Sequence, residues 1–192
     1  VIPSSTQQKS LAVNGMSYSK RDGKNANSAI LVQIPVKDFD HGHPLDGFKF
    51  QKQLEQQAYL DLFEAPAENI QEYVDHKVPS ALRIPSSYPR NTQLTDMHTL
   101  FSSDVNIALE DGFKNFDRKI PGFLSKGIMV GMESRSSSPI RITREEDGQS
   151  ISCKGIYPCG EGAGYAGGIV SSAVDGIRQA ENVLAHIRET EK

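Results

Sequence analysis

The stretch GIYPCGEGAGYAGGIVSSAVDGIRQAENVLAHI, residues 155–187, decides how the C-terminal part of this chain folds. Five of the nine positions in 160–168 are glycine, and Gly162, Gly164 and Gly167 spell G-x-G-x-x-G. After them, apolar residues recur at helical spacing, which predicts a helix from about Gly167 to His186. The residues just before the glycines, 151–159, predict a strand.

The glycine pattern stands in the wrong place for the opening unit of a dinucleotide-binding fold. That fingerprint needs a second parallel strand after its helix, with an acidic residue about 20 positions further on. Here only IRETEK follows His186, and no strand can form from it. The residues favour half of a nucleotide site instead. Amides at a helix start carry partial positive charge, glycines let backbone approach a ligand, and Glu161 can accept hydrogen bonds from sugar or ribityl hydroxyls.

The rest of the sequence predicts a mixture of helices and strands. Helices are expected where apolar residues recur every three or four positions, over 47–63, 68–76 and 102–120. Ser102 or Ser103 is expected to cap the last of these. Strands are expected over 29–36, 127–133 and 139–144. The fold class is therefore α+β, and the pattern changes at the division between 1–126 and 127–192.

The composition is that of an ordinary globular protein and excludes several functional classes. Of 192 residues, 37% are hydrophobic and 23% charged, and the net charge of −3 comes without a basic block. We therefore expect no nucleic-acid surface. No apolar run reaches about 18 residues, so we expect no membrane segment. Two cysteines are too few for a disulfide framework, which indicates a reducing, cytoplasmic compartment.

Three stretches of the sequence carry a resemblance to a known family. The order of apolar strand, Gly160-Glu161 and helix resembles the C-terminal flavin motif of two-part FAD oxidoreductases. More closely, residues 155–181 resemble the uncharacterised bacterial family of FAD-dependent dehydrogenases, a distant relative of the NAD(FAD)-utilising flavoproteins. LAVNGMSYSKRDGKNANSAILV, 11–32, and VGMESRSSSPIRITR, 130–144, are similar to the same family.

The resemblance implies an α/β flavoprotein fragment. Residues 1–126 would form a mixed α+β substrate or cap domain, and residues 127–192 the C-terminal strands and helix of an incomplete Rossmann-like FAD-binding domain. The family's N-terminal strand–GxGxxG–helix, which carries the FAD pyrophosphate, does not occur in this sequence, and Val1 is not an initiator Met. We therefore expect the missing N-terminal FAD-binding segment of the same protein to be a partner of this chain. Whether the fragment alone binds FAD stays open.

The resemblance also implies which residues contact the cofactor. Glu161 would contact the ribityl chain, and the amides around 166–169 would face the pyrimidine edge of the flavin. The implied cofactor-binding residues are Gly160, Glu161, Gly162, Gly164, Tyr165, Ala166, Gly167, Gly168 and Ile169. Two alternatives stay open: the glycines can serve only close helix–strand packing, and Tyr165 can be a filler of the core.

Candidates on the substrate side come from the other two stretches. They are Met16, Ser17, Arg21 and Arg141. Arg21 would offer charge to an anionic substrate, although a plain turn and hairpin explain that segment equally well. The alternation in PIRITR, 139–144, also fits a solvated strand face.

The remaining polar candidates favour structural explanations. No metal site is expected: His41 and His43 suit a loop, and His76, His98 and His186 are scattered. Cys159 is expected to be a small buried side chain and Asp175 a surface or capping charge. No catalytic acid or base can be identified.

Together these observations predict a fragment of a FAD-dependent oxidoreductase. The full-length enzyme would transfer a hydride between the flavin and an unknown small organic molecule. One alternative is a non-catalytic module that binds a protein, RNA or metabolite and keeps a vestigial flavin segment. A second is a structural domain without activity of its own.

Overall fold

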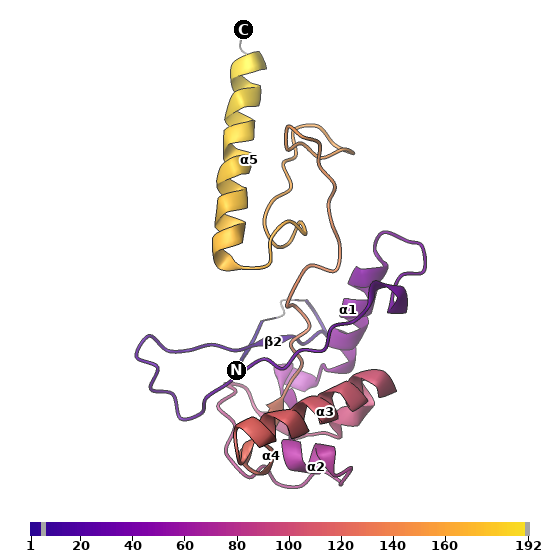
Figure 1. Cartoon of the computed structure of the whole chain (residues 1–192), viewed down its shortest axis with the longest axis vertical. Helices are drawn as coiled ribbons and strands as arrows, with labels where there is room; N and C mark the ends of the chain where they lie inside the picture. Colours follow the sequence, from indigo (N-terminus) through magenta and orange to yellow (C-terminus); the bar gives the residue numbers. More distant parts are fainter. Residues whose placement is uncertain (5–6, 191–192) are drawn as a thin grey trace. The chain divides into compact units, whose positions relative to one another are not determined.

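The computed structural model describes residues 1–4 and 7–190 and has the expected α+β class, with helices and a small mixed sheet (Figure 1). The chain divides into two compact units. Unit 1 comprises Val1–Asp38 and Phe50–Ser134, and unit 2 comprises Phe39–Lys49 and Arg135–Lys192. Unit 1 thus runs on to Ser134, and the functional division at 126/127 stays a prediction. Within the described part of the chain, no helix has the length and apolar character needed to cross a membrane.

The sheet of unit 1 has three strands in the order β4-β3-β5. The central strand β3 (Ala65–Asn69) runs parallel to β4 (Thr92–Leu94) and antiparallel to β5 (Ile128–Val130). Every residue of β3 is buried. The predicted helix over 68–76 is therefore wrong in its first part, because the chain is still in a strand and α2 covers only Ile70–Val74.

Three helices of unit 1 pack against one another: α2, α3 (Ser103–Lys119) and α4 (Phe123–Lys126) (Figure 1). The helix predicted over 102–120 is confirmed as α3, but its N-cap residue Ser102 makes no side-chain capping bond. Leu109 and Phe113 of α3 are buried in the core. The other buried members of this core are Leu11, Val13, Ala58, Ala65, Ile70, Tyr73, Tyr88, Met97, Leu100 and Met132.

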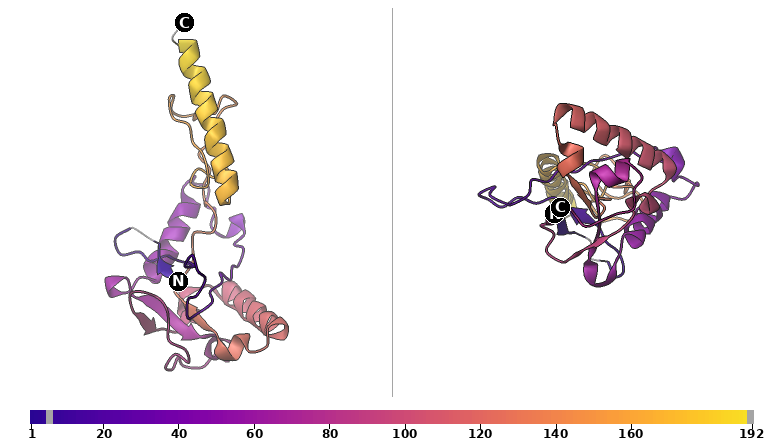
Figure 2. Two further views of the ribbon diagram at one scale, coloured as in Figure 1. Left: turned by 90° about the vertical axis from the view of Figure 1, so that its left-hand side faces the viewer. Right: turned by 90° about the horizontal axis from the view of Figure 1, so that it is seen from below.

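The N-terminal segment enters the same core and then leaves it as an exposed loop. β1 (Ile2–Pro3) pairs with β2 (Val13–Asn14), and the Val13 amide donates to the Met132 carbonyl at 2.9 Å. The following loop runs outward from unit 1 (Figure 2). The strand predicted over 29–36 is not formed. Ile30 and Val32 do pack against the core, but the segment is extended without a pairing partner.

The predicted helix over 47–63 is shorter in the structure. It appears as α1 (Asp46–Gln57) and a separate 3-10 turn, η2 (Asp61–Phe63), in which Leu62 and Phe63 have positive φ of 58° and 59°. Two further 3-10 turns are η1 (Val36–Asp38) and η3 (Met97–Leu100).

Unit 2 consists mainly of an irregular segment and one long helix, α5 (Ile169–Thr190), beside it (Figure 1). The helix confirms the prediction of a terminal helix. The strands predicted over 139–144 and 151–159 are wrong, because only isolated bridges link Arg144 to Ser150 and Ser150 to Cys153.

Candidate functional site

A partly buried ion pair anchors the glycine-rich loop to α5. Arg144 holds Asp175 with two hydrogen bonds, Nη2 to Oδ1 at 2.7 Å and Nη1 to Oδ2 at 3.0 Å. The Gly160 amide donates to the same Asp175 at 2.8 Å, and Arg144 also donates to the Pro158 carbonyl at 2.8 Å. The pair therefore fixes the point where the chain enters the loop relative to the second turn of α5.

The charges of this pair perturb each other. The hydrogen bond from Arg144 lowers the pKa of Asp175, and the Gly160 amide adds to that effect against the cost of burial. The same contact raises the pKa of Arg144. Asp175 is only 8% exposed, so the prediction of a surface or capping charge is wrong. Sequence alone could not reveal the pair, since no motif links the two positions.

Tyr165 is held within the loop by two arginines. The Arg144 guanidinium lies 3.7 Å from the centre of its ring and that of Arg141 lies 4.9 Å away, distances typical of cation–π contacts. The tyrosine hydroxyl accepts a hydrogen bond from the Arg144 amide at 3.1 Å. Arg141 donates through Nε and Nη2 to the Gly164 carbonyl, at 3.1 and 2.9 Å. Tyr165 and Arg141 thus shape the loop. The contact of Tyr165 with the cofactor and of Arg141 with the substrate stays a prediction.

The glycines of the loop serve two different purposes. A Cβ at Gly164 would lie 2.5 Å from the Ile140 carbonyl, and the residue has a φ of +82°. Gly164 is therefore required by packing within the loop itself. Gly162 and Gly167 have open space where a Cβ would stand and have no positive φ. Nothing within the described chain explains why these two positions are glycine.

The start of α5 is uncovered. Ile169 is 92% exposed and Val170 76%, so hydrophobic neighbours do not plug the helix end. The first amides of a helix lack intrahelical partners and carry partial positive charge. The Gly168 amide is engaged by the Ser171 hydroxyl at 3.1 Å. Glu161, Ala166 and Gly167 lie in or beside the same turn. The open helix end and the space beside Gly162 and Gly167 leave the backbone of this turn accessible to a ligand.

The substrate-side candidates belong to both units. Met16, Ser17 and Arg21 are exposed on the loop of unit 1, where Asn27 donates to the Met16 carbonyl at 3.1 Å, while Arg141 belongs to unit 2. Their roles stay predictions. Cys159 is exposed and not disulfide-bonded, so its prediction as a buried side chain is wrong.

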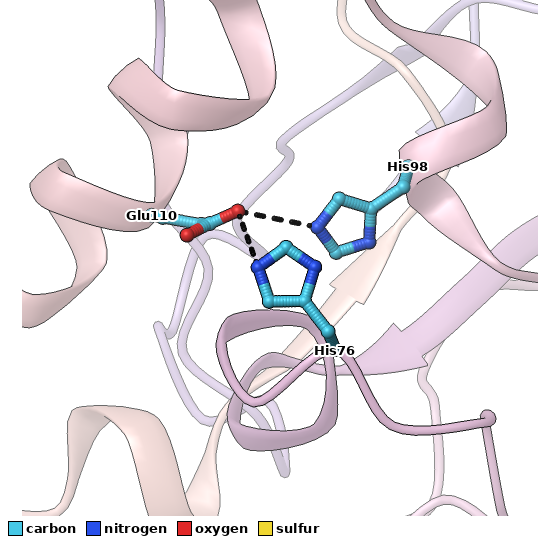
Figure 3. Close-up of side chains that lie close together, drawn as sticks. All are labelled: His76, His98 and Glu110. Atoms are coloured by element: carbon cyan, nitrogen blue, oxygen red, sulfur yellow. Dashed lines mark hydrogen bonds and ion pairs between the residues drawn. The ribbon is translucent and has the colours of Figure 1, made fainter. Parts of the chain in front are cut away.

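A second cluster of polar side chains lies in unit 1 and was missed by sequence reasoning. His76, just after the end of α2, meets His98 of η3 and Glu110 of α3 (Figure 3). The histidines were interpreted as scattered because their spacing along the sequence matches no ligand motif. Only the fold brings them together.

Comparison with known proteins identifies the family. A model described as "FAD-dependent protein, C-terminal domain-like" matches residues 1–136. An uncharacterised protein of Clostridium beijerinckii (strain ATCC 51743 / NCIMB 8052) is 37% identical over 189 residues, which are 96% of this chain and 36% of that protein. The chain thus spans about a third of the length of this relative. The glycine-rich loop lies beyond the residues that the family model matches. The chain belongs to the FAD-dependent proteins, as a C-terminal domain-like part.

Proposed function

We propose that the full-length protein is a FAD-dependent oxidoreductase that transfers a hydride between its flavin and a small organic substrate. In this proposal, residues 160–169 of the present chain form one side of the flavin site. The observation that carries it is the uncovered start of α5, directly after a loop whose Gly162 and Gly167 have no packing role among the residues that the structure describes. Family membership supports FAD as the cofactor.

The residues present would hold and tune the flavin rather than react. Glu161 would accept hydrogen bonds from ribityl hydroxyls, and the amides at 166–169 would favour negative charge on the nearby edge of the ring. Arg144, Asp175 and Tyr165 would keep the loop in place through the contacts described above. FAD supplies the hydride chemistry, and the protein contributes binding, orientation and electrostatics.

A partner segment is part of this proposal. Asp175 and Gln179 of α5 are buried, whereas six large apolar residues of the same helix are exposed: Ile169, Val170, Val174, Ile177, Leu184 and Ile187. A helix of a globular protein normally buries its apolar side. The Clostridium beijerinckii relative is nearly three times as long as this chain, since the chain covers 36% of it. We therefore assign this surface, the α5 apolar face, to the N-terminal FAD-binding segment of the same protein.

The proposal is tested with the full-length protein. We expect it to purify with flavin absorbance in the visible range, and added FAD to raise its melting temperature. Anaerobic addition of candidate reductants, followed at the flavin absorbance band, would then identify the class of substrate. A colourless full-length protein whose melting temperature does not respond to FAD would reject the oxidoreductase and favour a binding module.

The role of Glu161 is tested separately. Glu161→Ala should weaken FAD binding about 10-fold, because hydrogen bonds to a charged acceptor contribute about 1.5–3 kcal/mol. Glu146→Ala, at an exposed acid outside the glycine-rich loop, is the control. Unchanged FAD affinity in Glu161→Ala would remove the ribityl assignment but leave the rest of the proposal standing.

A further inference from the structure

The cluster of His76, His98 and Glu110 has converging ligand atoms. Glu110 Oε1 lies 3.2 Å from His76 Nε2 and 3.3 Å from His98 Nε2, and both rings direct this nitrogen toward the carboxylate (Figure 3). All three ligand atoms lie within 4.8 Å of one another. Two imidazoles and one carboxylate are a common donor set for zinc.

We propose that His76, His98 and Glu110 bind one divalent transition-metal ion of the Zn²⁺ class. Zinc lies about 2.0–2.2 Å from nitrogen and oxygen ligands, so two ligands of a tetrahedral shell stand about 3.3–3.5 Å apart. The two distances from Glu110 Oε1 are close to that separation. The site belongs to unit 1, and it goes beyond the flavin function proposed for unit 2.

The ring of His98 has an orientation suited to metal binding. Its Nδ1 lies 3.4 Å from Asp96 Oδ1, which leaves Nε2 directed at Glu110. A carboxylate on the second ring nitrogen is the usual support of a metal-bound histidine. The ring stacks on the buried Tyr73 at 4.0 Å between centres, and Asn106 donates to the His98 carbonyl at 3.0 Å.

His76 is placed by the end of α2. The His76 amide bonds the Tyr73 carbonyl at 3.2 Å, and the Lys77 amide bonds the Glu72 carbonyl at 2.9 Å. These two bonds form a Schellman motif with His76 at the left-handed position, φ 52°, where glycine or asparagine is usual. The ring stacks near His98 at 4.6 Å between centres. The side chain is 65% exposed, so a metal ion and a water ligand have access from solvent.

The surroundings of the cluster carry more negative than positive charge. Glu68 and Asp96 lie near His98 on its other side, and among the described residues Glu68 Oε1 is a buried atom with no hydrogen-bond partner. Lys114 Nζ lies 3.6 Å from Glu110 Oε2, but its side chain is 45% exposed and can turn toward water. The field therefore favours a cation.

The competing explanation needs no metal. Both histidines could donate an Nε2 hydrogen to Glu110 Oε1 as ordinary hydrogen bonds. The two explanations differ in one measurable respect. Only a metal site gives a stoichiometric response to Zn²⁺ that depends on all three side chains.

The test is metal titration of the EDTA-treated, dialysed protein. Calorimetry with Zn²⁺ should show one site with a dissociation constant in the micromolar range or tighter, and Co²⁺ should give visible d–d absorption. Glu110→Gln and His76→Asn should each weaken Zn²⁺ binding at least about 10-fold. Asparagine suits the left-handed position, so His76→Asn should fold without metal as well as the parent protein.

A double variant, His41→Asn with His43→Asn, is the control for the other pair of histidines and should leave the affinity unchanged. The proposal is rejected if the parent protein shows no Zn²⁺ binding below about 100 μM. It is also rejected if both Glu110→Gln and His76→Asn bind Zn²⁺ as the parent does, or if the control variant abolishes the binding instead.

Discussion

The glycines of the loop differ in what requires them: a ligand for some, and packing within the chain for another. Gly162 and Gly167 have room for a Cβ in the chain itself, whereas Gly164 has a Cβ position 2.5 Å from the Ile140 carbonyl. We expect Gly162→Ala and Gly167→Ala to change the free energy of unfolding of this chain by no more than about 0.5 kcal/mol, as a surface substitution does. The melting temperature should therefore stay nearly the same. In the full-length protein they should lower FAD affinity at least about 10-fold, because the new methyl group occupies ligand space.

Gly164→Ala is the matched comparison, since it should destabilise unit 2 even without FAD, by on the order of 2 kcal/mol from strain at positive φ. Thermal unfolding of the three variants, with and without FAD, measures both effects. Full FAD affinity in both Gly162→Ala and Gly167→Ala would count against a flavin at this loop.

Asp175 should make the stability of unit 2 depend on pH. Its pKa in the folded state is lowered, chiefly by Arg144, so the charged form is favoured by folding. This contribution is complete above the unfolded pKa of about 3.9 and is lost as pH falls through the lower folded pKa. Asp175→Asn should therefore lower stability at pH 7 by about 2 kcal/mol, because it weakens the charge-assisted hydrogen bonds from Arg144 and from the Gly160 amide.

The difference between parent and Asp175→Asn should shrink below about pH 4, where the Asp175 carboxylate begins to protonate in the unfolded chain while it is still charged in the folded one. Circular dichroism melts from pH 3 to 7 would show this change, with Glu146→Gln, on the exposed turn, as the control. If the difference in stability between the parent and Asp175→Asn is the same at every pH, the charge of Asp175 has no role in stability.

The α5 apolar face permits a prediction at the level of the element. Ile177 and Leu184 lie on this face and are 62% and 52% exposed. Ile177→Glu and Leu184→Glu should leave the melting temperature of this chain nearly unchanged, because neither side chain is buried. In the full-length protein they should lower the melting temperature and weaken FAD binding, since burying a carboxylate without a partner is costly.

Ala185→Glu, an exposed position on the flank of the same helix, should be neutral in both proteins. Differential scanning fluorimetry of the four proteins in both lengths is sufficient. If Ile177→Glu and Leu184→Glu are neutral in the full-length protein too, another surface receives the N-terminal segment.

Helices were predictable from the sequence where strands were not. The periodicity of α3 and α5 is local, so both were found within a few residues. β3 has the sequence APAEN, and Pro66 argues against a central strand. In the structure Ala65 and Ala67 make their backbone hydrogen bonds toward β4. On the other side, β5 pairs only with Ala67 to Asn69. The missing N–H of Pro66 therefore breaks no hydrogen bond of the sheet.

The candidate sites divide in the same way. The glycine-rich turn before α5 was found because its signal is a contiguous run of residues. Arg144 with Asp175, and His76 with His98 and Glu110, were not found, because each set comes from separate segments joined only by the fold. Residues 139–144 and 151–159 alternate or run apolar like strands, yet bends and turns interrupt them and only isolated bridges form.

At the scale of the whole molecule, the two units have different interiors. All members of the hydrophobic core cluster belong to unit 1. Among the described residues of unit 2, Ala163 is the one buried hydrophobic residue, and the other buried side chains there include Asp175, Gln179 and Ser150. Hydrophobic burial is the main driving force of folding, so unit 2 has little stability of its own.

Hydrogen exchange should reveal this difference. In the 192-residue chain we expect slow exchange for amides of α3 and β3, which border the core, and fast exchange for α5, whose apolar face is exposed. In the full-length protein with FAD, α5 should become at least about 10-fold slower, while α3 changes little, because only α5 gains a hydrophobic cover. Mass spectrometry of both proteins under the same conditions measures the rates. An α5 that already exchanges as slowly as α3 in the short chain would show that unit 2 folds stably without any further segment.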